Sequence, residues 1–327
     1  PAGAAPRSPV EESLAEMWKA VLKVRSIGVH DQFFELGGHS LLATQVASRI
    51  REMFGVDLPL RLLFEKTTIA ELAEEVICAR KQGQSGIVAP PITRANRELP
   101  LPLSFSQQRM WFMHQLAPEE TAYNMPAAMK LSGSLNRSAL AHALNGMAQR
   151  HESFRTTFAV TTDGPVQIIR PAEPLTWEEL DLRPLPESRR VQEAASIVAQ
   201  ESGRPFDLVK GPLARYLLIQ IGNEEHILLL HMHHIIGDQW SFAVIAREFT
   251  ALYNEYCHGR TAVAEPSAIQ YADFALWQRR CLTEDVLQPQ LAYWRKRLAG
   301  LHVLALPTDY PRPQVQRFNG SYRALDL

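Results

Sequence analysis

Apolar residues recur at the spacing of an α-helix in three stretches of the first eighty residues. The first stretch follows Ser8, whose side chain can accept a hydrogen bond from the Glu11 amide while the Glu11 carboxylate returns the bond. The second stretch covers 40–54 and stops at Gly55, and the third begins near Thr68. The pattern therefore predicts a small all-α bundle of three or four short helices.

A change of pattern separates this bundle from the rest of the chain. Residues 81–99 contain Gly, Ser, Gln and a Pro-Pro pair without periodicity, which indicates a flexible linker. From residue 100 onward, helical and strand patterns alternate, as is typical of an α/β or α+β layered domain. The predicted helices are 138–150, 187–201 and 242–256, and the predicted buried strands are 214–221 and 226–235. We expect three segments: 1–80, 81–99 and 100–327.

Composition narrows the function classes. Hydrophobic residues make up 46% and charged residues 21%, as in ordinary globular proteins. The net charge is −1, with no basic excess to bind nucleic acid. The 3 cysteines are widely spaced, which predicts a reduced, cytoplasmic protein. No signal pattern or membrane-spanning stretch is present, and because the chain begins with Pro rather than Met we expect a segment of a longer polypeptide.

The stretch 31–42, DQFFELGGHSLL, contains the first candidate site. Two glycines allow a sharp turn, and Ser40 follows at the start of a predicted helix, where free amides and the helix dipole favour negative charge. A hydroxyl placed there suits attachment of a phosphate-linked group. The alternative is that Ser40 is only a helix N-cap.

In its helical context, this stretch resembles the peptidyl carrier domain of nonribosomal peptide synthetases, and the resemblance covers residues 8–78. It implies that Ser40 carries 4′-phosphopantetheine, whose thiol holds the growing chain as a thioester. It also implies a partner phosphopantetheinyl transferase. In that family a histidine at the position of His39 accompanies carriers without a neighbouring epimerase, which hints at an L-configured donor residue.

The second candidate site is 231–241, HMHHIIGDQWS. On a strand, His231 and His233 point to one face and His234 to the other. Three interpretations remain open. The histidines can be ordinary hydrogen-bonded side chains; His231, His233 and Asp238 can bind a metal ion; or a histidine near a carboxylate can act in acid–base catalysis.

The pattern HHIIGDQWS resembles the HHxxxDG signature of condensation domains, which share the chloramphenicol acetyltransferase-like fold. Further stretches resemble other motifs of that family: 103–111 (LSFSQQRMW), 123–126 (YNMP), 150–158 (RHESFRTTF), 271–278 (YADFALWQ) and 306–309 (LPTD). These matches occur in order over more than 200 residues. They imply an α/β lobe of that fold, truncated here, because family members have a second lobe of similar size and an active-site tunnel between the two.

The resemblance implies peptide-bond formation, in which the amine of an acceptor aminoacyl thioester attacks a donor thioester. By position His234 is the active-site histidine, which either removes a proton from the amine or holds the amine and the developing charge. His233 is expected to help build the site. Asp238 is expected to orient the loop through an arginine, with Arg155 preferred over Arg150. No metal ion is expected.

Of the residues 239–241, only the first departs from the family pattern. Gln239 stands where the family has Gly, so the backbone is strained if it needs positive φ, or else the amide reaches into the channel and alters acceptor choice. Trp240 and Ser241 are interpreted as packing and helix-capping residues. Since only the first lobe and the start of the second are present, we expect that this chain alone can lack activity.

The resemblance also implies the partners. Because the carrier precedes the condensation domain, it should deliver the donor chain, with an upstream adenylation domain and a downstream carrier as further partners of the same assembly line. No nucleic acid or membrane partner is expected. Two alternatives remain: a non-catalytic docking platform of the same fold, which usually lacks the second histidine that His234 retains, and an unrelated hydrolase or metalloenzyme that uses the histidine cluster.

Overall fold

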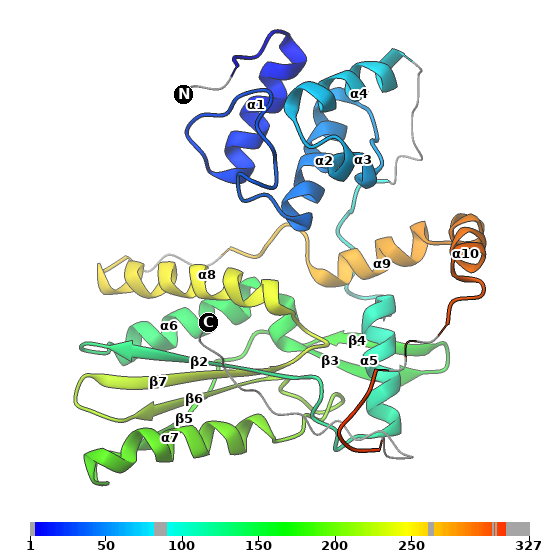
Figure 1. Cartoon of the computed structure of the whole chain (residues 1–327). Coiled ribbons are helices and arrows are strands. Elements are labelled where there is room, and N and C mark those ends of the chain that lie inside the picture. The colour runs from blue at the N-terminus through cyan, green and yellow to red at the C-terminus, as the bar shows by residue number, and fades with distance from the viewer. Residues whose placement is uncertain (1–3, 82–89, 261–264, 303, 305, 312–327) are drawn as a thin grey trace. The chain divides into compact units, whose positions relative to one another are not determined.

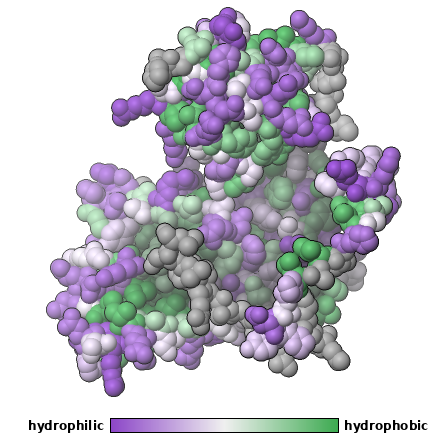
Figure 2. Space-filling model, in the orientation of Figure 1, coloured by the Kyte–Doolittle hydropathy of each residue, from purple (hydrophilic) through white to green (hydrophobic). Residues whose placement is uncertain are grey.

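The computed structural model describes residues 4–81, 90–260, 265–302, 304 and 306–311. The chain divides into two compact units, Pro1–Pro90 and Pro91–Leu327 (Figure 1). Polar side chains cover much of the face shown in Figure 2, interrupted by apolar patches. Among the described residues, no helix is both long enough and apolar enough to span a membrane.

The first unit is the predicted helical bundle. It contains α1 (Pro9–Leu22), α2 (Ser40–Phe54), the short α3 (Leu60–Glu65) and α4 (Ile69–Lys81). Its core consists of side chains from all four helices and from the loop after α1, including Leu14, Trp18, Phe33, Val46, Ile50, Leu63, Ile69, Leu72 and Val76. The periodic apolar positions of the sequence therefore form one core, since residues three and four apart share a helix face.

Local capping sets the helix ends of this unit, with one difference from expectation. The Ser8 side chain accepts a hydrogen bond from the Glu11 amide at 3.2 Å, as predicted. The Glu11 carboxylate, however, bonds the backbone N–H and guanidinium of Arg7 rather than Ser8. The expected exchange with Glu71 does form at Thr68, and α2 ends at Gly55 with φ of 67°.

The second unit is a layered α/β structure. Its strands are β1 (Leu101–Pro102), β2 (Asn124–Ser132), β3 (Thr156–Thr161), β4 (Gly164–Ile169), β5 (Glu178–Asp181), β6 (Ala214–Gln220) and β7 (Glu225–His233). Its helices are α5 (Phe105–Leu116), α6 (Arg137–Arg150), α7 (Glu187–Ser202), α8 (Gln239–Cys257), α9 (Tyr271–Cys281) and α10 (Glu284–Leu298), with a 3₁₀ turn at Glu152–Arg155. The predicted helices and strands are confirmed, except that β7 ends two residues earlier and α8 begins three residues earlier than expected.

Two sheets organise this unit. One has the order β1-β4-β3, and the other has the order β2-β7-β6-β5, antiparallel except for the β5–β6 pair. Figure 1 shows α6 and α8 on one face of the larger sheet and α7 on the other. Alternate residues of β7 follow these faces: Leu230 and Met232 join the α6–α8 core, while Leu229 joins the α7 core. The central position of β7 places its last residues at the edge of a well-packed core.

The predicted linker lies partly within the second unit. Residues 82–89 lie outside the described residues. Ala95 is only 8% exposed and its amide donates to the Asp273 carboxylate, while Arg97 forms ion pairs with Glu152 and Asp273. The part of the expected linker at 95–97 is therefore bound to the folded domain.

Candidate functional site

Ser40 is the first residue of α2 and is exposed. The N-cap is His39, which has extended backbone angles and makes no side-chain capping bond. The Ser40 hydroxyl forms no hydrogen bond with another described residue, so it does not serve as the cap that one interpretation of the sequence proposed. An exposed hydroxyl at the N-terminus of a 15-residue helix suits covalent attachment of a phosphate-linked group.

The two glycines before Ser40 hold the loop in different ways. Gly37 has φ of 90°, a backbone conformation that residues with a Cβ rarely adopt. Gly38 lies against Phe33: an added Cβ would fall 2.5 Å from the Phe33 carbonyl oxygen and closer still to its ring. Phe33 is 1% exposed and packs edge-to-face on Trp18, with ring centroids 4.8 Å apart. The carrier core therefore positions the start of α2 and with it the Ser40 hydroxyl.

The histidine tract straddles the end of β7. His231 and His233 lie on the strand and share a face, as predicted, because the Phe206 ring contacts both with centroid distances of 4.7 and 6.1 Å. His234 lies beyond the strand end, in the turn that leads to α8. Its direction is therefore set by the turn and not by the strand alternation on which the sequence-based expectation relied.

Two backbone carbonyls position His234. Its amide donates to the Tyr123 carbonyl at 2.8 Å, and its Nδ1 lies 2.7 Å from the Gly237 carbonyl oxygen. A carbonyl oxygen only accepts, so Nδ1 carries the proton and donates it to Gly237. In the neutral ring Nε2 then has a free lone pair. The half-buried His234 is thus oriented as a proton or hydrogen-bond acceptor at Nε2.

His233 and His231 are placed for support rather than for proton transfer near neutral pH. His233 is 4% exposed, and its Nδ1 accepts a hydrogen bond from the Ile235 amide at 3.1 Å, which helps close the turn. Burial, with smaller contributions from nearby histidines, lowers the pKa of His233 to about 3. Burial likewise lowers the pKa of His231, which is 1% exposed, to about 4, with a smaller effect of Arg215. Both rings are neutral at pH 7.

A small cavity lies beside His233. Its volume is about 170 Å³, and His114, Glu120 and Tyr123 line it together with His233. Burial lowers the pKa of His114 from its usual value, against the raising effects of Asp207 and Glu119. The Tyr123 ring stands 6.0 Å from His233 and 6.4 Å from His234 by ring centroids, so it lies close to both histidines.

Asp238 caps α8, and this is a correction to the expected arginine pairing. Its carboxylate accepts hydrogen bonds from the Ser241 amide at 2.9 Å and the Ser241 hydroxyl at 2.7 Å, while the Asp238 amide donates to the same hydroxyl. Among the described residues no arginine is hydrogen-bonded to it or ion-paired with it. Asp238 therefore orients the turn by fixing the start of the helix, and Ser241 is a capping residue as predicted.

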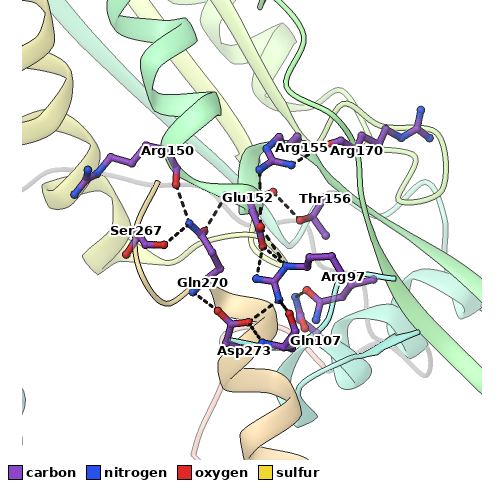
Figure 3. Close-up of polar contacts among 12 residues, drawn as sticks. Arg97, Gln107, Arg150, Glu152, Arg155, Thr156, Arg170, Ser267, Gln270 and Asp273 are labelled. Atoms are coloured by element: carbon purple, nitrogen blue, oxygen red, sulfur yellow. Dashed lines mark hydrogen bonds and ion pairs between the residues drawn. The ribbon is translucent and has the colours of Figure 1, made fainter. Parts of the chain in front are cut away.

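The two candidate arginines lie in another network (Figure 3). The Arg150 guanidinium donates to the Glu265 carbonyl at 2.7 Å and pairs with Glu248 at 3.1 Å. The Arg155 guanidinium donates to the Arg170 carbonyl at 2.6 Å. The partners of Arg150 and Arg155 come from segments that lie beside the 150–156 turn in the fold. The spacing of residues in the sequence could not reveal these pairings.

Gln239 and Trp240 begin α8. Gln239 has helical backbone angles, and Lys23 is the one non-glycine residue with positive φ in the part of the chain that is described. Gln239 therefore causes no backbone strain here, and the glycine of the family pattern is not needed to avoid it. Trp240 is 48% exposed, so the expected packing role is not seen for this side chain.

The groups that orient His234 were absent from the sequence-based site. Tyr123 belongs to a motif noted in the sequence, but its carbonyl and that of Gly237 are backbone groups with no side-chain signal. The described residues also contain no cluster of three or more His, Cys, Asp or Glu side chains that could hold a metal ion. His231, His233 and Asp238 are thus not gathered around one point.

Family models match both units. The phosphopantetheine attachment site model matches residues 12–76, and the condensation domain model matches residues 98–327. The chain is 47% identical over 318 residues to part of the linear gramicidin synthase of Brevibacillus parabrevis, and 40% identical over 322 residues to a dimodular nonribosomal peptide synthase of Bacillus subtilis. These alignments cover 97% of this chain but only 6% and 13% of the relatives' lengths.

Solved structures agree with this assignment. The X-domain from teicoplanin biosynthesis superimposes with a TM-score of 0.61 at 29% identity, over 68% of this chain and 49% of that chain. The same domain in its complex with OxyB gives a TM-score of 0.59 at 31% identity, over 70% and 50% of the two chains. The chain therefore belongs to the condensation-domain family of nonribosomal peptide synthetases, and a phosphopantetheine carrier domain precedes its condensation domain.

Proposed function

We propose that this chain delivers a donor acyl or peptidyl thioester from Ser40 to the condensation domain, where His234 assists its transfer to an acceptor amine. The observation that most directly supports this role is the Nδ1 hydrogen bond of His234 to Gly237, which leaves Nε2 as the acceptor. The family relationship supplies the reaction class, which is acyl transfer that forms an amide bond.

The residues at the carrier site fit 4′-phosphopantetheine. The Ser40 hydroxyl is exposed and makes no hydrogen bond to the part of the chain that the structure describes, and it stands at the positive end of α2. When bound, the group supplies the thiol that holds the acyl chain as a thioester. A phosphopantetheinyl transferase is the expected modifying partner.

At the condensation site, His234 Nε2 is proposed to accept a hydrogen bond and then a proton from the amine that attacks the donor thioester. As the C–N bond forms and the thioester C–S bond breaks, His234 returns this proton to the leaving thiolate. Its Nδ1–H remains bonded to Gly237, which holds the ring in place and stabilises the imidazolium once it forms. His233 and Asp238 act indirectly, because they hold the two sides of the turn between β7 and α8. An upstream adenylation domain and a downstream carrier are proposed to supply the two substrates.

The carrier assignment is tested by intact mass after incubation with coenzyme A and a promiscuous phosphopantetheinyl transferase. We expect the mass of one phosphopantetheine to be added, and Ser40→Ala to prevent it. Thr44→Ala is a matched control, because Thr44 lies one turn further along the exposed side of α2. Loading of the Ser40→Ala variant would show that another residue is modified.

The catalytic assignment is tested in a synthetase chain that contains the whole condensation domain. His234→Ala should reduce peptide formation by about 10²–10⁴-fold. His231→Ala, which removes a nearby histidine from the strand, should leave most of the activity if the chain remains folded. Unchanged product formation by the His234→Ala variant would exclude His234 as the acid–base group.

A second candidate is a non-catalytic docking platform. It is favoured by one observation: the X-domain that this chain resembles has been solved in complex with another protein, OxyB. If His234→Ala preserves peptide formation while surface variants of the condensation domain abolish recruitment of an enzyme, this second function replaces the first.

A further inference from the structure

The end of the expected linker is held by two acidic side chains of the condensation domain (Figure 3). The Arg97 guanidinium donates to the Asp273 carboxylate at 2.6 Å and to both oxygens of the Glu152 carboxylate, the closer of them at 2.7 Å. The Ala95 amide donates to the same Asp273 oxygen at 2.9 Å. Arg97 also donates to the Ala95 carbonyl at 3.0 Å, so 95–97 forms a closed turn against the two acids.

These contacts are buried and charged, which distinguishes them from an ordinary surface ion pair. The Asp273 side chain is fully buried, and the side chains of Glu152 and Arg97 are 9% and 22% exposed. Burial disfavours the Asp273 carboxylate, yet the bonds from Arg97, Ala95 and Gln270 outweigh it and lower its pKa. A buried acid of this kind needs its cationic partner, because an unpaired buried charge is costly.

Gln270 joins the two acids into one unit. The backbone amide of Gln270 donates to the Asp273 carboxylate at 2.7 Å. Its side-chain oxygen accepts a hydrogen bond from the backbone amide of Glu152 at 3.0 Å. Its side-chain nitrogen donates to the Arg150 carbonyl at 2.9 Å. The turn at 150–156 and the start of α9 are thereby fastened to each other, and Arg97 binds both at once.

The segment that follows Arg97 in the chain makes further contacts with α9. The Ser104 and Tyr271 hydroxyls lie 3.0 Å apart, the Phe105 amide donates to Gln278 at 2.9 Å, and the Arg279 guanidinium donates to the Leu103 carbonyl at 2.8 Å. The strand β1 at Leu101–Pro102 pairs with β4. Arg97 thus precedes these contacts in the chain and fastens the segment that comes from the carrier to the condensation domain.

We propose that Arg97 is a positioning residue that anchors the interdomain tether, so that the tether joins the condensation domain at Ala95 rather than at β1. The inference rests on the proposed function, since its consequence concerns delivery of the donor. With the anchor closed the tether comprises 82–94, and with the anchor open it extends to β1. For a flexible chain the effective concentration falls with about the −3/2 power of length, so opening the anchor should lower it by about twofold.

The anchor itself is tested by hydrogen exchange in the 327-residue chain. In the wild type, the Ala95 amide should exchange slowly, because it donates to a buried carboxylate. Arg97→Ala should accelerate that exchange by about tenfold or more, as expected on loss of a charge-assisted hydrogen bond. Arg94→Ala is the matched control, since Arg94 is an exposed arginine three residues away in the same segment, and it should leave the exchange unchanged.

Two results would overturn the proposal. One is an Ala95 amide that exchanges in the wild type as fast as an unstructured amide, and the other is unchanged protection in Arg97→Ala. Should Arg97→Ala fail to fold, Arg97→Lys replaces it, because lysine keeps the charge but cannot bind both acids with a planar fork. Faster Ala95 exchange with unchanged α9 protection in that variant supports the anchor, and unchanged Ala95 exchange refutes it.

The effect on delivery is tested in a synthetase chain with the whole condensation domain. Arg97→Ala should lower the rate from a donor loaded on Ser40 by about twofold. In a Ser40→Ala background supplied with a soluble donor thioester, Arg97→Ala should have no effect. An equal loss with the soluble donor would show that Arg97 acts on the condensation site and not on the tether. Loss of Ser40 loading would instead refute the proposed function and leave the hydrogen-exchange result intact.

Discussion

The adjacent glycines before Ser40 allow one substitution to be tested in two physical settings. At Gly38, an alanine Cβ would lie 2.5 Å from the Phe33 carbonyl oxygen, so backbone as well as ring must move. Phe33 is 1% exposed in the carrier core, where overpacking costs about 1–3 kcal/mol and more when backbone shifts are forced. We therefore expect Gly38→Ala to lower the free energy of unfolding by about 3 kcal/mol.

Gly37→Ala is the matched control. An alanine Cβ at Gly37 meets no atom within 4 Å, and only the positive φ of 90° is unfavourable. Such a backbone conformation costs a residue with a Cβ about 1–2 kcal/mol. Since the two variants carry the same added methyl group on neighbouring residues, their difference of about 1–2 kcal/mol reports the contact with Phe33.

The assay is thermal unfolding of residues 1–90, whose core side chains all come from within that segment. The fluorescence of Trp18, which is 1% exposed and touches the Phe33 ring, follows the transition. For a domain of this size each kcal/mol shifts Tm by about 4–8 °C, so Gly38→Ala should melt about 4–16 °C below Gly37→Ala. The Gly38→Ala variant should also load phosphopantetheine more slowly, because Gly38 lies against Phe33 and directly precedes the turn into the helix that starts at Ser40. Equal melting temperatures of the two variants would refute the argument.

Three predictions concern the second site. Because burial lowers the pKa of His231 to about 4, below the unfolded value of about 6.5, stability should fall as the pH drops from about 6.5 towards 4. His231→Leu should reduce that fall in urea unfolding followed across this pH range, and an unchanged pH dependence would contradict it. Asp238→Ala should cost about 1–2 kcal/mol in urea unfolding through loss of the α8 cap, whereas Asp238→Asn, which keeps a capping oxygen, should cost far less; equal losses would point to a charge partner instead. Gln239→Gly should not raise the unfolding midpoint, because the Gln239 backbone is already helical, and a stabilising effect would reveal strain.

Secondary structure followed from short-range features of the sequence. The helix at 40–54 and the helix that begins near Thr68 are predicted by apolar residues three and four apart and by end signals such as Gly55 and the Thr68–Glu71 pair. Each of these signals acts within a few residues, so it is visible without a fold. The errors were also local: α8 begins at Gln239 because Asp238 caps it, and β7 ends before His234 because the turn starts there.

The candidate site was located from motifs, but its chemistry was only partly predictable. Ser40 stands at a helix start as expected, and His234 lies at the end of β7. The expected pairing of Asp238 with Arg150 or Arg155 is wrong, because Asp238 bonds Ser241 three residues away while both arginines find partners elsewhere. The capping role of Ser241 was predicted, but its partner was not, because Asp238 had been assigned to an arginine.

Local pattern was thus sufficient for the two kinds of unit, for several helices and for the helix start at Ser40, because spacing and capping depend on neighbours in the chain. The helices α5, α9 and α10 were not predicted, and His234 was assigned through the family motif. The Gly237 carbonyl that sets the tautomer of His234 is only three residues away, but the position of the ring required the folded protein, since the Tyr123 carbonyl that holds the His234 backbone comes from a distant segment. The contact that anchors the tether also required the folded protein. Arg97 and Asp273 are 176 residues apart in sequence and form a 2.6 Å contact, and only burial of both in one core makes them partners.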